Sequence, residues 1–227
     1  SAFVGSFFPA YLFAFAETEI SSSVTAVMVS LTPLFTLLIS VIIFGEELLK
    51  KQVFGVIIGF LGIVVLINNE LLSSSFNIFY VMFIVLAAFC YAVNANVLKY
   101  KLPDIPALGI VFMSFLFLFI PAFIVLLFSD FPFSNFTTNP LIMESIVYIV
   151  ILALFGTAIA KVLYIKLLAI STPVFSVSTT YLMPVVAIFW GLLDGENFTL
   201  TQFIGTSIIL VGVYLCLLYT SDAADDR

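Results

Sequence analysis

The feature that most constrains this chain is a series of long apolar segments, separated by short polar stretches. A helix needs roughly 20 apolar residues to cross the hydrocarbon core of a bilayer, and eight segments approach or reach that length. Membrane-spanning strands would alternate polar and apolar residues, and these segments do not. The sequence therefore predicts eight membrane-spanning helices, at 1–16, 21–44, 52–68, 76–99, 106–128, 144–169, 173–193 and 202–218.

The composition places the chain among integral membrane proteins. Of its 227 residues, 63% are hydrophobic and 9% are charged, whereas about a quarter of the residues of a soluble domain are charged. The chain has no histidine, which excludes imidazole metal sites, Ser-His-Asp triads and histidine proton relays. The two cysteines lie in apolar segments and indicate no disulfide framework.

Basic residues between the predicted spans indicate how the chain is oriented. The lysines at the predicted loops and helix ends all fall on one side of the membrane: Lys50, Lys51, Lys99, Lys101 and Lys166. In the loops on the other side, every charged residue is acidic. Because cytoplasmic loops are enriched in lysine and arginine, the lysine side is predicted to be cytoplasmic. We expect a multi-pass protein of a bacterial inner membrane with its C-terminus in the cytoplasm.

One motif occurs twice, about 150 residues apart. Each copy has a proline, a Gly-Glu pair, a glutamine and two glycines in the same order and at nearly the same spacing. The copies are Pro33, Gly45, Glu46, Gln52, Gly55 and Gly62, and Pro184, Gly195, Glu196, Gln202, Gly205 and Gly212. Five predicted spans make up this period, and an odd number of crossings inverts the second unit. Inverted repeats are a recurring architecture of secondary transporters.

The repeat predicts how the chain is divided. We expect residues 1–69 to be the last three helices of a first repeat and residues 70–218 to be a complete five-helix second repeat. The fold class expected is thus an all-α integral membrane protein, with about eight spans of a ten-helix parent. Residues 219–227 resemble the translation of a sequencing adapter, with residue 216 as an alternative start, and we expect them to lie outside the fold.

The doubled motif resembles the EamA-like family of the drug/metabolite transporter (DMT) superfamily, and the resemblance covers nearly the whole chain up to residue 218. It implies a secondary active transporter that exports small metabolites, such as amino acids, related metabolites or drugs, by alternating access. A sugar-phosphate or nucleotide-sugar exchanger of the same superfamily and an uncoupled channel are the alternatives.

Other functions and partners follow from what the spans lack. No paired carboxylates and no nucleophile with a base lie at membrane depth, and the sequence has no phosphate-binding loop of the P-loop kind. We therefore expect no enzymatic activity, no cofactor and no metal. The expected partners are a small-molecule substrate and the lipid bilayer, without nucleic acid, and a homodimer is left open.

Lys161 is the first candidate for substrate contact. A lysine near the centre of a membrane helix costs about 2.5–3.5 kcal/mol on the insertion scale, and no Asp or Glu lies at comparable depth in the predicted spans. Thr157, Lys161 and Tyr164 are spaced i, i+4 and i+7, which predicts a polar stripe on one helix face. We expect the stripe to line the cavity and Lys161 to bind a carboxylate or phosphate. The alternative is a lysine that snorkels or lines a wet cavity without selecting a substrate.

Three other residues are weaker candidates for substrate contact. Tyr91 and Asn94 share a helix face at i and i+3, although an amide in a membrane helix is more often a packing contact worth about 0.6 kcal/mol. Tyr181 follows a group of serines and threonines just before Pro184, and it is a candidate cavity residue.

The repeated motif itself is expected to be structural. Pro33 and Pro184 are predicted at hinges, where nearby hydroxyls can bond the carbonyls that a proline leaves free. The two Gly-Glu pairs are predicted at tight turns, with each glutamate stabilising the start of the next helix. The glycines of the spans at 52–68 and 202–218 are predicted to form close-packing surfaces.

Overall fold

A computed structural model describes residues 1–20, 25, 28–46, 50–66, 78–129, 140–183, 185–186 and 200–225, without the side chains of residues 51, 66, 140–141, 202 and 216–225. All regular structure within these ranges is helical, which confirms the predicted all-α fold. Three of the helices are long and apolar enough to cross a membrane: Ile78–Lys101, Ala107–Leu127 and Ile142–Ile170. Shorter apolar helices are Phe3–Ala16, Thr32–Phe44, Gln52–Val65 and Phe203–Leu215.

The helical elements follow one another with few residues between them. In chain order they are η1 (Phe3–Phe7), α1 (Phe8–Ala16), α3 (Thr32–Phe44), α4 (Lys50–Leu66), α6 (Ile78–Lys101), α7 (Ala107–Leu127), α8 (Pro140–Ile151), η3 (Leu152–Ile159), α9 (Ala160–Ile170), α10 (Pro173–Ser178), η4 (Thr179–Tyr181) and α12 (Leu200–Asp225). The segments η1 and η3 are π-helical, and η4 is a 3₁₀ turn. Helix α12 extends beyond residue 218, where the predicted span ends.

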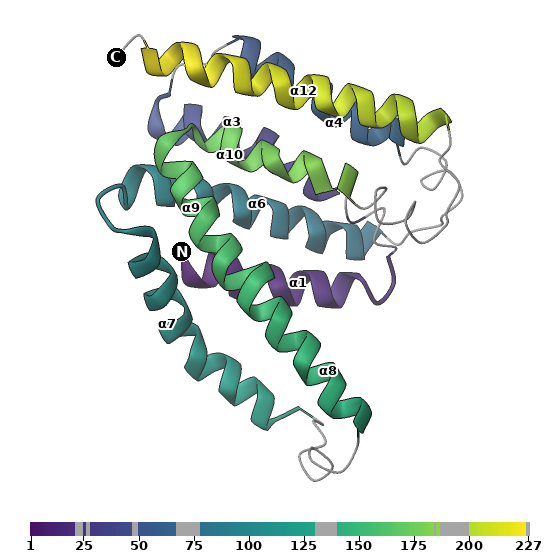
Figure 1. Ribbon diagram of the computed structural model, residues 1–227, viewed down its shortest axis with the longest axis vertical. Coiled ribbons are helices and arrows are strands. Elements are labelled where there is room, and N and C mark those ends of the chain that lie inside the picture. Colours follow the sequence, from purple (N-terminus) through teal and green to yellow (C-terminus); the bar gives the residue numbers. More distant parts are fainter. Residues whose placement is uncertain are drawn as a thin grey trace.

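The bundle is built from pairs of packed helices (Figure 1). Helix α12 lies beside α4, and α6 contacts both α1 and α3, while α10 contacts α3. Helices α7 and α8 extend away from this group (Figure 1). Their outward side chains are apolar, for example Phe117 and Ile149, which are 62% and 60% exposed. Such a surface suits lipid rather than water.

Glycines allow α4 and α12 to approach closely. A Cβ added to Gly62 would lie 2.7 Å from the backbone nitrogen of Ile209 and 3.0 Å from the carbonyl oxygen of Gly205. One added to Gly212 would overlap the backbone of Gly59 and lie 2.8 Å from the oxygen of Gly55. The predicted close-packing surface is therefore confirmed.

These glycine contacts are also reciprocal between the two motif copies. Gly62 of the first copy meets Gly205 of the second, and Gly212 of the second meets Gly55 of the first. Reciprocal contacts of this kind are what a two-fold relation between equivalent helices produces. They support the repeat at these two helices, while the five-helix unit stays a prediction.

Two predicted spans are interrupted near their centres. Helix α3 begins at Thr32, after a turn at Ser30 and Leu31, although the sequence predicts one span over 21–44. Helix α10 ends at Ser178 and continues as the 3₁₀ turn η4, within the predicted span 173–193. Both interruptions come just before the repeated proline, in keeping with the predicted hinges.

Hydroxyl side chains supply hydrogen bonds at the second interruption. The hydroxyls of Thr179 and Thr180 donate to the carbonyl oxygens of Ser176 and Val177 at 2.6 and 2.8 Å. Where a helix breaks in a membrane, such bonds satisfy carbonyls that have lost their helical donors. Pro33 lies in the first turn of α3, where its missing N–H is no loss.

The Gly45–Glu46 corner joins α3 to the segment before α4. Gly45 has φ 68°, and its N–H bonds the oxygen of Val41 at 3.1 Å, while the N–H of Glu46 bonds that of Ser40 at 3.1 Å. This is a left-handed glycine cap of the αL kind, which confirms the predicted tight turn. The Glu46 side chain, expected to stabilise the next helix, bonds the hydroxyl of Tyr100 in α6. Pro184, Gly195 and Glu196 lie outside the described residues.

Candidate functional site

Lys161 lies near the start of α9, with a hydroxyl and an aromatic ring beside its amino group. The side chain is half-buried. Its Nζ donates a hydrogen bond to the Ser6 hydroxyl in η1 and lies 5.6 Å from the centroid of the Phe115 ring in α7. Within the described part of the chain, no carboxylate pairs with Lys161. The protein thus holds a cation in an apolar region with a hydroxyl and an aromatic face as its neighbours.

Each partner of the Lys161–Ser6 contact lies in or next to a π-helical segment of its own chain region. Ser6 lies within η1, and η3 ends two residues before Lys161. The pairs Gly5-Ser6 and Gly156-Thr157 are 151 residues apart, so a π-helical distortion occurs at matching places in the two predicted repeat units. Short π-helical segments within α-helices are frequent at functional sites. Their position in both units favours this contact as the centre of the site.

Asn94 of α6 contacts the neighbouring residue of η1. Its amide packs on Gly5, because a Cβ added to that glycine would lie 2.5 Å from Asn94 Cγ. The residue is only 6% exposed, and its Oδ1 has no hydrogen-bond partner among the described residues. An unpaired buried oxygen is unfavourable. Asn94 and Lys161 therefore place two incompletely satisfied polar groups beside consecutive residues of η1.

The structure brings Tyr91 to the same helix interface as Asn94. Its ring stacks on that of Phe13 in α1, with centroids 5.9 Å apart and an interplanar angle of 26°. Since Phe13 and Gly5 both belong to the first apolar helix, Tyr91 and Asn94 do share a face of α6, as their spacing predicts.

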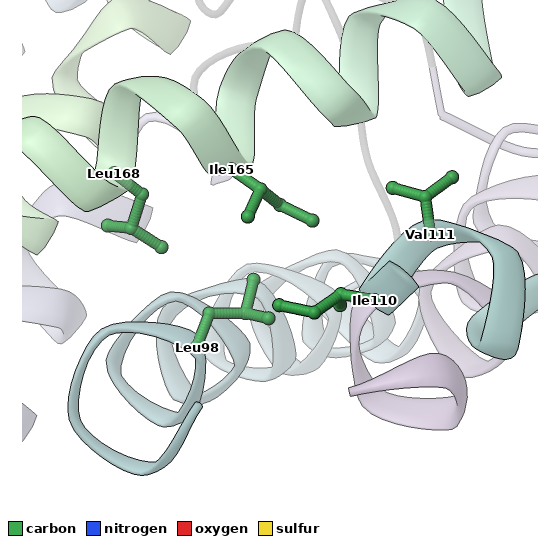
Figure 2. Close-up of a cluster of buried hydrophobic side chains, with 5 residues drawn as sticks. All are labelled: Leu98, Ile110, Val111, Ile165 and Leu168. Atoms are coloured by element: carbon green, nitrogen blue, oxygen red, sulfur yellow. The ribbon is translucent and has the colours of Figure 1, made fainter. Parts of the chain in front are cut away.

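Tyr164 faces an apolar cluster between three helices. It packs, with Phe115, against buried side chains that come from α6, α7 and α9 and are drawn in Figure 2: Leu98, Ile110, Val111, Ile165 and Leu168. Lys161 lies over the Phe115 ring, and Tyr164 packs against the same buried cluster as Phe115, so both face the α7 side of α9. The cluster holds the segment that bears Lys161 against the bundle.

Thr157 does not share the surroundings of Lys161. It is exposed, and its hydroxyl donates to the carbonyl oxygen of Leu152 at 3.4 Å. The i, i+4 spacing assumes a regular α-helix, whereas the π-helical η3 has wider turns. The structure therefore separates Thr157 from the predicted polar stripe.

Tyr181 lies in the core formed with α4 and α12, not beside Lys161. It is 0% exposed, its hydroxyl donates to the carbonyl oxygen of Val56 at 3.1 Å, and its ring packs on Gly59. Its neighbours in this cluster include Ile63 and Ile209. In this conformation the side chain has a packing role.

Sequence reasoning missed two residues that the structure emphasises. Ser6 and Phe115 are the neighbours of Lys161. A signal for Ser6 exists, since it is the repeat counterpart of Thr157. Phe115 is one of 27 phenylalanines, so its sequence context does not distinguish it. Among the described residues, no group of three or more His, Cys, Asp or Glu could hold a metal ion.

Comparisons with known proteins agree with a helical membrane protein. The family described as the EamA-like transporter family matches residues 1–68 and 78–218. A protein of Archaeoglobus fulgidus described as an uncharacterized transporter is 30% identical over 205 residues, which is 88% of this chain and 69% of that protein. A crystal structure titled only as that of a protein matches 96% of this chain and 75% of its own, with a TM-score of 0.74 at 17% identity. At that identity the likeness concerns the fold alone.

Proposed function

The chain belongs to the EamA-like transporter family, and from that premise we propose that it exports small metabolites across a bacterial inner membrane by alternating access. It acts as a secondary active transporter, with its C-terminus in the cytoplasm. Family membership supports the transporter class, and the named metabolites (amino acids, related compounds or drugs) are the expected substrates. The Lys161 site supports the chemistry of recognition.

Lys161 is the observation on which substrate recognition rests. An intramembrane charge is unfavourable and usually marks a substrate or ion path. Because its neighbours are a neutral hydroxyl and an aromatic ring, an anion that reaches Nζ would form a charge-assisted hydrogen bond that neither can provide. Lys161 therefore binds a carboxylate or phosphate of the substrate, with Ser6 and Asn94 as neighbouring polar contacts.

An exchanger of sugar phosphates or nucleotide sugars is the second candidate function. The same observation favours it, because a single cation beside a hydroxyl also suits a phosphate. An uncoupled channel is the other alternative. It differs from a carrier because its flux does not saturate and does not accelerate when substrate is present on the opposite side.

Counterflow in proteoliposomes tests these proposals. Purified protein is reconstituted into proteoliposomes, which are filled with one unlabelled compound from a panel of amino acids, sugar phosphates and uncharged analogues. Uptake of the same compound in labelled form is then followed. We expect saturable counterflow for an anionic or zwitterionic compound. Lys161→Ala should lower its uptake about tenfold or more, since a hydrogen bond to a charged group is lost, whereas Lys161→Arg should retain part of it.

Lys166→Ala is the matched control for this experiment. Lys166 lies on the same helix and is exposed, so its removal changes the charge without touching the site. Unchanged uptake and substrate preference in Lys161→Ala would contradict the role of Lys161. Flux that does not saturate would indicate a channel and contradict the carrier.

A further inference from the structure

Helices of the two motif copies meet at the end of the bundle where the predicted cytoplasmic lysines lie. Here α3 and α4 both contact α10. Leu37, Val56 and Val174 form a buried apolar cluster between these three helices. Partly buried side chains surround it: Leu34, Val53 and Phe175. The cluster closes this end of the contact between the two units.

One hydrogen bond links the two units beside this cluster. Gln52, the glutamine of the first motif copy, donates from Nε2 to the hydroxyl oxygen of Thr172 at 2.7 Å, and it is only 8% exposed. The same oxygen accepts the N–H of Phe175 at 3.2 Å, which makes Thr172 the N-cap of α10. Gln52 therefore binds the residue at which α10 begins.

Lys99 fixes the preceding helix from the other side. Its Nζ donates to the carbonyl oxygens of Leu168 and Ala169 at 3.0 Å each, in the last turn of α9. A cation at a helix C-terminus is stabilised by the helix dipole. Only Ser171 and Thr172 separate α9 from α10, so the start of α10 cannot move far while Lys99 and Gln52 keep their bonds.

We propose that the Gln52–Thr172 bond is a latch that keeps the cytoplasmic end of the transport path closed, and that its release accompanies opening to the cytoplasm. The inference rests on the proposed function, since alternating access moves one repeat against the other and must break contacts between them at one end. An interhelical hydrogen bond in a membrane protein is weak enough to break during such a cycle. The glutamine of the motif thus positions α10 and contacts no substrate.

Cysteine accessibility tests the latch without any substrate. Val174→Cys, in a chain with Cys90→Ser and Cys216→Ser, serves as the reporter because Val174 is 5% exposed within the apolar cluster. Everted membrane vesicles are treated with a membrane-impermeant maleimide. Adding Gln52→Met removes the bond at similar side-chain volume and leaves Thr172 as the cap of α10. We expect labelling to become about threefold faster, as one interhelical hydrogen bond predicts.

A second reporter separates latch release from general loosening of α4. Ile63→Cys lies on the same helix as Gln52 and is fully buried against α12, so its labelling should not change. Thr172→Ser keeps the hydroxyl and should label at the wild-type rate, whereas Thr172→Val should label faster.

Three results would overturn the latch. They are equal labelling of the Val174 reporter with and without Gln52→Met, a parallel increase at the Ile63 reporter, or an equal increase in vesicles of the opposite orientation. The proposed function is tested separately by counterflow. If Gln52→Met speeds labelling of the Val174 reporter but no counterflow occurs, only the transport function is contradicted. If counterflow occurs and labelling is unchanged, only the latch is contradicted.

Discussion

Asn94 and Asn96 show how two amides in one helix come to have different roles. They are two residues apart in α6, and because an α-helix has 3.6 residues per turn they point to nearly opposite sides. Asn96 faces α3, where its Oδ1 accepts from Ser40 at 2.7 Å and its Nδ2 donates to the Thr36 oxygen at 3.2 Å. Asn94 faces η1 with an unpaired oxygen. One amide binds two helices together, and the other packs on Gly5 with its oxygen unpaired among the described residues.

Replacing Asn96 should weaken the α3–α6 interface. Asn96→Leu removes both interhelical bonds, and we expect the free energy of unfolding to fall by about 1 kcal/mol. Unfolding in mixed detergent micelles measures this change. Ser207→Ala is the control, because that exposed hydroxyl bonds only the Phe203 oxygen of its own helix and should have no effect. An Asn96→Leu protein as stable as wild type would contradict the assigned role.

Tyr181→Phe distinguishes a core residue from a cavity residue. The change removes only the hydroxyl that bonds Val56, so we expect about 1 kcal/mol less stability and unchanged substrate preference. The measurements are micelle unfolding and the counterflow panel. Altered preference at unchanged stability would instead support the cavity role that the sequence suggested.

At the scale of elements, the π-helical segments decide which residues can meet. A regular helix over 144–169 would align Thr157 with Lys161, and η3 prevents this alignment. The contact made by Lys161 comes instead from Ser6, the repeat counterpart of Thr157, on another helix. Lys161 thus takes its polar partner from another helix instead of from the predicted stripe.

Glycine substitutions test the α4–α12 pair. The Cβ of Gly212→Ala would meet the backbone of Gly59 rather than a flexible side chain, and we expect a loss of about 1–3 kcal/mol from overpacking. Gly109→Ala in α7 is the control, since its Cβ would meet only a methyl of Ile105 at 3.8 Å. That variant should be neutral, or more stable by up to about 1 kcal/mol, because alanine favours a helix. Equal effects of the two changes in micelle unfolding would argue against close packing.

For the whole molecule, the lysine distribution predicts the orientation. Asp104 lies in the exposed corner between α6 and α7 on the lysine side, and Glu17 lies at the exposed end of α1. In a chain without its native cysteines, Asp104→Cys should react with an impermeant maleimide only in everted vesicles. Glu17→Cys should react only in right-side-out vesicles. Reversed sidedness would refute the predicted orientation, and labelling from one side for both would refute the number of crossings between them.

Much of the fold could be predicted because its determinants are local in sequence. The apolar lengths gave the helices at 78–101 and 107–127 to within a few residues. The glycine spacing predicted a close-packing surface on each of α4 and α12, and the structure shows that these surfaces meet. A hinge at Pro33 was predicted from the motif, whereas hydropathy, which remains high through the break near Ser30, predicted one continuous span. The distortion at η3 was missed for the same reason, because π-helical and α-helical turns have similar composition.

The sequence by itself determined that this protein is a helical membrane protein, because a helix that crosses a bilayer needs an apolar segment of about 20 residues. It also contains the repeated motif. Lys161 could also be identified from the sequence, because a charged residue inside a long apolar segment is visible without the tertiary structure. Only the tertiary structure decided what Lys161 and Gln52 meet. Ser6 is 155 residues from Lys161 and Thr172 is 120 from Gln52, and contacts over such separations depend on how helices pack, which no local pattern records.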